Sequence, residues 1–178
     1  MHLLSGKDAV ARITGAISPK HQVHGYAVNL TAKNISAVDP IGMVDLGGNE
    51  YRSAGAVAIA AHRRTPEDKY LWWNLSRGAY FVEFNETLEL APNEIALLEP
   101  DERLIRAGAS HTTVMLRGRV APIEMLLDVP AMTVQIKQNA RISLVRVFQF
   151  NTSGPQVGSI AKVITVAAAK SGSKKKKP

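Results

Sequence analysis

The chain has 178 residues, of which 46% are apolar and 21% charged, a mixture typical of a globular domain rather than a disordered segment. It has no cysteine, which excludes disulfides, zinc–thiolate sites and thiol nucleophiles. No apolar run approaches the roughly 18 residues that span a bilayer, and polar residues interrupt the N-terminus at 5–8. These features predict a cytoplasmic protein that does not enter a membrane.

The net charge of +7 is unevenly distributed along the chain. Residues 1–173 carry only +3, because four of the charges come from Lys174, Lys175, Lys176 and Lys177. Residues 170–178 are therefore expected to form a disordered, lysine-rich tail. Such a tail either keeps the chain in solution or contacts the phosphates of nucleic acid or a ribonucleoprotein. Four lysines alone would bind weakly and in a salt-sensitive way.

The first residues predict a short helix. Ser5 suits an N-cap, and Asp8 three residues later completes a pair resembling a capping box. Apolar residues then recur at helical spacing as far as Ile17, while Gly15 and Pro19 end the element.

Beyond Pro19 the sequence pattern is that of β-structure. Apolar and polar residues alternate over 26–31, residues 54–61 favour a strand over a short helix, and residues 62–69 form a loop. Turns are expected at Asp39-Pro40, Gly47–Asn49, Arg77-Gly78, Pro92-Asn93, Pro100-Asp101, Arg117-Gly118, Pro130 and Gln138-Asn139. Short strands are expected at 70–74, 79–85, 87–90, 95–99, 112–116, 122–128, 132–137, 142–150 and within 157–168. Many short strands separated by turns indicate a sandwich or a barrel.

Several common catalytic motifs are absent from the sequence, among them the phosphate-binding loop, the His-Glu-x-x-His zinc helix and the Gly-x-Ser-x-Gly elbow. His21 and His24 are the most closely spaced histidines, but without a cysteine beside them they are better explained as loop residues than as metal ligands. No metal site is predicted. The Trp72-Trp73 pair favours core or interface packing over base stacking.

Four stretches, taken in order, carry a resemblance to a known family. They are Leu3-Leu-Ser-Gly-Lys-Asp, then His24-Gly-Tyr-Ala-Val-Asn-Leu, then the segment from Gly78 to Thr113, and finally Ile136-Lys-Gln-Asn-Ala-Arg-Ile-Ser-Leu-Val. Together they resemble the dUTPase/dCTP deaminase family, especially its archaeal dUTPase-like members. The resemblance covers about residues 3–150.

The resemblance implies a fold, an assembly and a chemistry. Residues 1–150 would form a distorted, jelly-roll-like β-barrel of the dUTPase type with a short N-terminal helix, and residues 151–169 a C-terminal extension. Such barrels are usually homotrimers with active sites between subunits. They hydrolyse dUTP to dUMP and pyrophosphate or deaminate dCTP to dUTP, with Mg²⁺ bound through the triphosphate.

The family's phosphate-binding segment usually reads Arg-Ser-Ser-Leu-x-Arg-x-Gly and resembles residues 101–108 here. The family residues are kept at Leu104, Arg106 and Gly108, whereas the leading Arg and both Ser are replaced by Asp101, Glu102 and Arg103. A carboxylate at this place repels a triphosphate unless Mg²⁺ or Arg103 lies between them. Arg103 and Arg106 remain candidates for substrate binding, and Arg106 equally suits an ion pair at a trimer interface.

The following stretch supplies the other candidates. His111-Thr112-Thr113 resembles the deaminases' His-x-Thr before the base-binding turn, but the dUTPase Asp-Pro-Gly-Tyr turn is missing. Glu124 falls close to the deaminases' catalytic Glu, in a register uncertain by one residue. A buried carboxylate there would suit a general acid or base, whereas on an alternating strand Glu124 would simply point outward.

Two functions follow from these residues. In an active dUTP diphosphatase or dCTP deaminase, Glu124 would move protons, Arg106 would hold phosphate, and His111 with Thr112 would position water or base. In a pseudoenzyme, the trimeric barrel would remain as a binding module or scaffold, with no cofactor. Because structural positions match the family and chemical positions largely do not, the sequence favours altered or lost catalysis.

Overall fold

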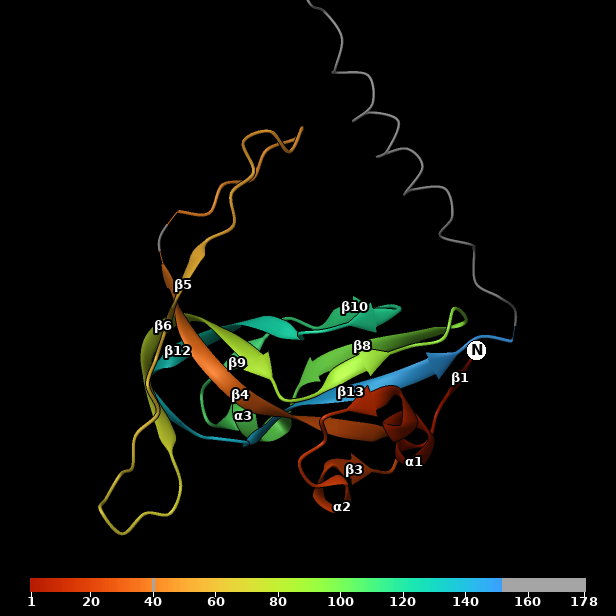
Figure 1. Cartoon of the computed structure of the whole chain (residues 1–178), viewed down its shortest axis with the longest axis horizontal. Helices are drawn as coiled ribbons and strands as arrows, with labels where there is room; N and C mark the ends of the chain where they lie inside the picture. Colours follow the sequence, from red (N-terminus) through yellow and green to blue (C-terminus); the bar gives the residue numbers. More distant parts are fainter. Residues whose placement is uncertain (40, 152–178) are drawn as a thin grey trace, which may run out of the picture.

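Antiparallel strands dominate the computed structural model, which describes residues 1–39 and 41–151 (Figure 1). The strands are β1 (His2–Leu3), β2 (Ile13–Thr14), β3 (Val23–His24), β4 (Ala27–Asp39), β5 (Gly55–Ala58), β6 (Trp72–Phe84), β7 (Thr87–Glu89), β8 (Glu94–Pro100), β9 (Ser110–His111), β10 (Val114–Leu116), β11 (Arg119–Val120), β12 (Glu124–Lys137) and β13 (Arg141–Gln149). The helices are α1 (Gly6–Ala9), the 3-10 helix η1 (Val10–Arg12), α2 (Pro19–Gln22) and α3 (Glu102–Arg106). The mainly β class predicted from the sequence is confirmed.

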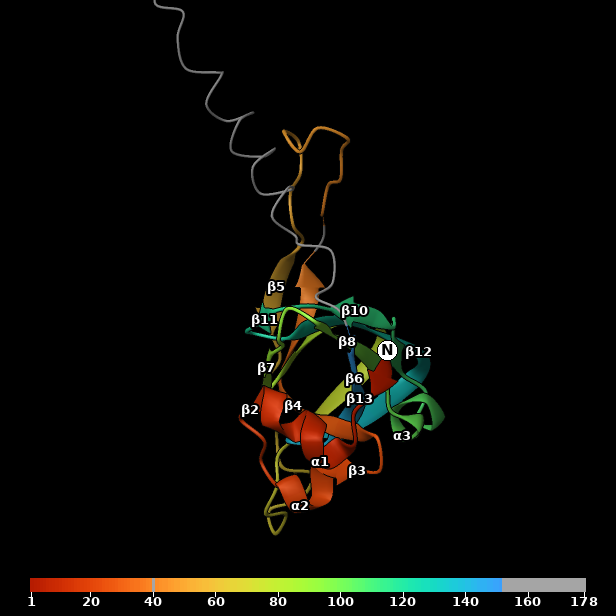
Figure 2. The same cartoon turned by 90° about the vertical axis from the view of Figure 1, so that its right-hand side faces the viewer.

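The large sheet brings together strands that are distant in sequence. Its order is β10-β8-β13-β4-β6-β12-β9, with β1 paired to β13 and with β3 and β5 paired to β4. A small sheet, β11-β7-β2, lies beside it, and Figure 2 shows the strands curling around a common interior. Because β4 lies between β13 and β6, the Val-Asn-Leu stretch becomes a neighbour of the Arg-Ile stretch that begins β13.

Alternating side chains define the interior of the barrel. On β12, Met125, Leu127 and Val129 are buried, whereas the intervening Glu124 and Leu126 are exposed. A strand with this period-two pattern has one face in the core and the other outside. The largest fully buried side chains include Phe84, Leu30 and Ile35, which pack with the inward residues of β12 in one core.

The N-terminal helix is shorter than predicted. Ser5 is the N-cap, and its Oγ accepts a hydrogen bond from the backbone N–H of Asp8 at 3.2 Å. The prediction of a helix as far as Ile17 is wrong, because Ile13 already belongs to β2 and pairs with Leu88 of β7. Pro19 does not end a helix but begins α2, a position that suits its missing N–H.

Two predicted turns lie inside long strands instead. β6 runs straight through Arg77-Gly78, and β12 runs through Pro130. Between the pairs Gly78↔Val129 and Ser76↔Thr133 the register shifts, so Pro130 lies where the ladder is already interrupted. The missing N–H of Pro130 therefore breaks no regular pair, and its carbonyl accepts a hydrogen bond from Arg77 Nε at 2.9 Å.

The sequence did not predict α3, the helix that follows β8. It ends at Arg106 with Ala107 as its C-cap. Gly108 follows with a φ of +92°, a conformation that favours glycine, and a Cβ there would meet the Cβ of Ala131 at 2.6 Å. The turn between β12 and β13 contains Asn139 at φ +61°, at a place where the family pattern has Pro-Gly. Asparagine tolerates this left-handed conformation better than most residues.

The remaining predicted elements have mixed outcomes. The strands near 26–31, 54–61, 87–90, 95–99 and 142–150 are confirmed by β4, β5, β7, β8 and β13. Pro40, the strand predicted within 157–168 and the lysine-rich tail lie outside the described residues. In the described part of the chain, no helix is long and apolar enough to cross a membrane.

Candidate functional site

Residues 101–108, which resemble the family's phosphate-binding segment, contain α3 and its N-cap. Asp101 is the N-cap, and its Oδ1 accepts a hydrogen bond from the backbone N–H of Arg103 at 2.9 Å. The Arg103 side chain folds back onto the same carboxylate, with Nε 3.0 Å from Oδ1 and Nη2 3.3 Å from Oδ2. Free backbone N–H groups are what an anion binds at such a place. Here the chain's own carboxylate takes one of these donors.

Asn29 on β4 meets this carboxylate from the other side. It is 1% exposed, and its Nδ2 donates to Asp101 Oδ2 at 2.8 Å and to the Ser143 carbonyl at 3.1 Å. Its Oδ1 lies 2.6 Å from His24 Nε2, which is the donor because the amide oxygen can only accept. The deaminase strand that residues 24–30 resemble usually reads Pro-Ala-Ser-Val-Asp-Leu, with Asp where this chain has Asn29, and a carboxylate there would face that of Asp101. The two departures from the family pattern therefore meet in space and suit each other.

The charge of Asp101 is stabilised by its hydrogen bonds. Burial alone would raise the pKa of Asp101, but the bonds from Arg103 and Asn29 outweigh it and hold the pKa below its usual value. Both carboxylate oxygens are already engaged by these donors. A Mg²⁺ ion needs free oxygen ligands, so this carboxylate does not fit one. Within residues 1–39 and 41–151, no cluster of three or more His, Asp or Glu could hold a metal ion.

An open cavity of about 700 Å³ lies against this network, between the β3–β4 turn, the start of α3 and β13. Three arginines, Arg103, Arg141 and Arg146, line it together with Asp101 and Glu102. Arg146 pairs with Glu99, and Arg141 donates to the His21 carbonyl. Arg103 and Arg146 are therefore paired with carboxylates of the chain, whereas Arg141 is bonded to a carbonyl and keeps its positive charge.

Arg106 lies on the outer surface of α3. Its Nη2 is 2.7 Å from Glu102 Oε1, and the two side chains are 79% and 74% exposed. The ion pair runs along the helix from one turn to the next. Among the described contacts Arg106 pairs with Glu102 and makes no hydrogen bond to Asp101 or Asn29, and its role in phosphate binding stays a prediction.

His111 is buried on β9 and faces the barrel interior. Its Nε2 lies 2.7 Å from Ser143 Oγ, and its Nδ1 lies 2.9 Å from the Thr112 carbonyl. Burial lowers the pKa of His111, although the bond to Thr112 acts in the opposite direction. The ring is therefore neutral at physiological pH. Thr112 and Thr113 follow β9 on the exposed surface.

Glu124 begins β12 on the outward face of the sheet. It is exposed and lies opposite Glu83 of β6. His111 pairs with Leu127 three residues further along, but it is buried on the inner side. The structure therefore does not bring Glu124 and His111 together within one chain, and a catalytic role for Glu124 stays a prediction.

The sequence analysis identified Asp101 and Arg103 but not the residues that are hydrogen-bonded around them. These partners are Asn29 from β4 and Ser143 from β13, whose carbonyl and hydroxyl also connect the network to His111. A signal was present, because Asn replaces the deaminase Asp at position 29. Only the pairing of β4 with β13 reveals that positions 29, 101 and 143 are neighbours.

Comparison with known proteins agrees with the resemblance seen in the sequence. No family model matches the chain. It is 28% identical over 150 residues to a probable deoxyuridine 5'-triphosphate nucleotidohydrolase of Methanosarcina acetivorans, covering 79% of this chain and 80% of the relative. The equivalent protein of Methanosarcina mazei is 29% identical with the same coverage.

Comparison with solved structures identifies a similar fold. The crystal structure of the 2'-deoxycytidine 5'-triphosphate deaminase from Agrobacterium tumefaciens superposes with a TM-score of 0.60 at 13% identity. The match covers 94% of this chain and 53% of the deaminase, so the chain spans about half of that protein's length. The predicted barrel of the dUTPase type is confirmed.

Proposed function

We propose that this chain is a member of the dUTPase/dCTP deaminase family, as its likeness to the Methanosarcina relatives supports, and that it no longer carries out the ordinary dUTPase or dCTP deaminase reaction. Its barrel serves instead as a binding module or scaffold. The observation that carries this proposal is the carboxylate of Asp101, which caps α3 where the family offers donors to phosphate.

The electrostatics of this place support the proposal. A triphosphate carries several negative charges, and it would have to approach the ionised Asp101 and the neighbouring Glu102. Arg103 is the nearest cation that could offset these two carboxylates, but its side chain is already bonded to Asp101. A phosphate would gain its contacts only after these bonds were broken and the carboxylate displaced, and breaking them leaves a partly buried charge unpaired.

The positions of the catalytic candidates also support the proposal. Glu124, Arg106 and His111 lie, respectively, on the outer face of β12, on the outer surface of α3 and inside the barrel. A proton-transfer group must come within hydrogen-bond reach of the reacting atoms. Within one chain these three residues do not converge on a common point.

The alternative is an active dUTP diphosphatase or dCTP deaminase that uses Glu124 and Arg106. The open cavity beside Asp101 favours it, because its three arginines could receive a deoxynucleoside triphosphate with its Mg²⁺. This reading requires residues of a partner subunit to complete the site.

The assembly and the remaining partners belong to the same proposal. We expect a homotrimer, as the family resemblance implies, and a location in the cytoplasm. Lys174–Lys177 are proposed as a contact to nucleic acid or a ribonucleoprotein. Removing residues 170–178 should then weaken the binding of RNA or DNA in low salt, and unchanged binding would take the tail out of the proposal.

Product release distinguishes the two functions. The purified full-length protein is incubated with dUTP or dCTP and Mg²⁺, and pyrophosphate and ammonia are measured. We expect neither product above the rate without protein, for the wild type and for Glu124→Gln alike. Sustained release by the wild type that Glu124→Gln abolishes would establish the enzyme and overturn the scaffold.

A further inference from the structure

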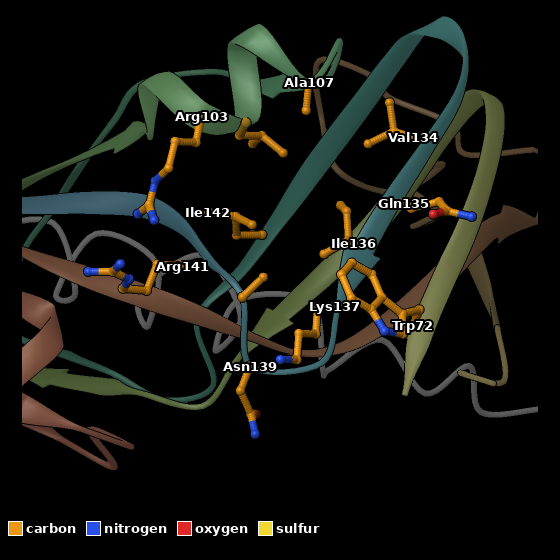
Figure 3. Close-up of a pocket in the computed structure, with 12 residues that line it drawn as sticks. Trp72, Arg103, Ala107, Val134, Gln135, Ile136, Lys137, Asn139, Arg141 and Ile142 are labelled. Atoms are coloured by element: carbon orange, nitrogen blue, oxygen red, sulfur yellow. The ribbon is translucent and has the colours of Figure 1, made fainter. Parts of the chain in front are cut away.

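A second cavity, of about 470 Å³, lies between α3, the end of β12 and the start of β13 (Figure 3). Its floor is apolar and is formed largely by the buried side chains of Leu104, Val134, Ile136 and Ile142. Arg103 and Arg141 stand at one end of it, and Trp72 and Lys137 at the other. An apolar floor between cationic and aromatic ends offers places for both a planar group and an anion.

Aromatic rings and cations are interleaved at the Trp72 end. The Lys137 ammonium lies 3.1 Å from the centroid of the Tyr70 ring, and the Arg64 guanidinium carbon lies 3.9 Å from that of Trp72. Asp68 accepts a hydrogen bond from Trp72 Nε1 at 3.1 Å and so fixes the indole. Tyr70 is 55% exposed. Trp73, by contrast, is a core residue, so only the first of the two tryptophans is available at the surface.

We call Arg64, Tyr70, Trp72, Arg103, Lys137 and Arg141 the basic–aromatic groove. Arg64 and Arg103 pair with Asp68 and Asp101. Lys137 and Arg141 form no ion pair with any carboxylate of the described residues. The groove therefore keeps an excess of positive charge. Since Arg103 and Arg141 also line the cavity beside Asp101, cations extend over two adjoining hollows.

The turn between β12 and β13 holds the two unpaired cations in place. Its ends are joined by a hydrogen bond from Ala140 N–H to the Lys137 carbonyl at 2.9 Å, and Gln138 N–H donates to the Leu71 carbonyl at 2.9 Å. The second bond fixes this turn against the segment that carries Tyr70 and Trp72. Lys137 and the two rings therefore lie together at one corner of the fold, where these two hydrogen bonds join the segments that carry them.

We propose that the basic–aromatic groove binds single-stranded nucleic acid. A base stacks on the exposed ring of Tyr70 or on Trp72, and the neighbouring phosphates contact Lys137 and Arg141. Lys137 has a flexible side chain that can move from the ring to a phosphate as a base takes its place. Stacking on aromatic side chains along a positive groove is how proteins hold single strands without reading their sequence. A duplex keeps its bases stacked inside and cannot use the rings.

This inference deepens the proposed function by naming the partner of the binding module, and its test does not depend on whether dUTP or dCTP is turned over. The full-length protein is titrated into a fluorescein-labelled oligothymidine of about 12 nucleotides, within the roughly 4–16 that single-strand sites cover. A labelled duplex and unlabelled dTMP serve as comparison ligands. Anisotropy is recorded at several salt concentrations.

The decisive comparison uses two double variants that lose the same residue types. Tyr70→Ser with Lys137→Gln changes the groove, whereas Tyr51→Ser with Lys7→Gln removes an exposed tyrosine and an exposed lysine elsewhere. We expect the groove variant to bind the single strand about tenfold more weakly or worse, because it loses a stacked base and a phosphate contact. The control should stay within about twofold of the wild type, since single exposed charges contribute little. The lysine-rich tail is present in all proteins and contributes equally.

Three results would overturn the assignment. They are equal binding by the groove variant and the wild type, equal weakening by the two double variants, and dTMP or duplex binding as tight as that of the single strand. Thermal unfolding checks that the groove variant is folded. If it is not, Lys137→Gln alone, which leaves the core packing intact, takes its place with the same criteria.

Discussion

Asp101 shows how a single residue changes what a helix start can bind. Serine or arginine there leaves backbone and side-chain donors directed at a ligand, but a carboxylate accepts them itself. In this chain the donors from Arg103 and Asn29 are engaged by the Asp101 carboxylate, and we propose that they are no longer offered to a phosphate.

This arrangement makes Asp101 a structural residue as well. We expect Asp101→Ala to lower the free energy of unfolding by about 1–3 kcal/mol, because α3 loses its N-cap and the buried Asn29 amide loses an acceptor. Urea denaturation monitored by tryptophan fluorescence measures this. The matched control is Glu102→Ala, which removes the neighbouring carboxylate from an exposed ion pair and should have little effect. Equal losses in the two variants would show that Asp101 is not held as described.

His111 predicts a pH dependence of stability. Its pKa is lowered by burial in the folded protein, so between that value and the ordinary 6.5 the unfolded chain binds more protons. The stabilisation is complete above the ordinary pKa and is lost as the pH falls below it, by at most about 1.4 kcal/mol per pH unit. We expect unfolding free energies of the wild type to fall between pH 7 and pH 5, and His111→Asn to reduce this slope. His62→Asn, on an exposed residue, should retain the slope; a slope unchanged by His111→Asn would contradict the assignment.

At the scale of elements, α3 illustrates what the sequence could and could not predict. Asp101 looks like an N-cap and Gly108 like a residue that follows a helix end, but the five residues of α3 are too few to show a helical period. The sequence also predicted two shorter strands in place of β6 and two in place of β12, because local turn signals lie within each. Arg77-Gly78 and Pro130 are local turn signals, and only the register shift of β12 against β6 explains why both remain inside strands.

The packing of α3 against β12 yields an element-scale prediction. Gly108→Ala should lower the unfolding free energy by about 1–3 kcal/mol or more, because it combines a positive φ with a contact to the Ala131 Cβ. Gly118→Ala is the matched control, since Gly118 has φ +61° but nothing within 4 Å of an added Cβ. Its cost should be limited to the backbone strain of about 1–2 kcal/mol. Thermal unfolding compares the two, and a Gly108→Ala variant no less stable than Gly118→Ala would refute the close packing of α3 on β12.

At the scale of the whole molecule, large apolar side chains lie outside the core. Val44 and Leu46 are 90% and 107% exposed in the segment between β4 and β5, which extends away from the barrel (Figure 1). Met132 on β12 is 81% exposed as well. Apolar surface of this extent is typical of chains that associate.

The expected homotrimer can be tested by measuring the mass of the protein in solution. Light scattering of the purified protein should report three times the 19.3 kDa mass of one chain. A mass equal to one chain, unchanged at increasing protein concentration, would contradict the trimer and leave the exposed side chains to another partner.

The barrel itself could be predicted from the order of the four resembling stretches, whereas the meeting of Asn29 with Asp101 could not. Asn29 lies on β4 and Asp101 directly after β8, and β13 runs between these two strands in the sheet. A list of departures from a family pattern does not reveal which of them are neighbours. Here the neighbours form one connected hydrogen-bond network.

Calorimetric titration of Mg²⁺–dUTP into the full-length wild type tests most directly whether Asp101 prevents a triphosphate from binding at the start of α3. We expect no saturable binding up to about 1 mM, the range in which a site contributing about 4 kcal/mol would fill. Saturable binding of Mg²⁺–dUTP by the wild type below this concentration would contradict the closed site.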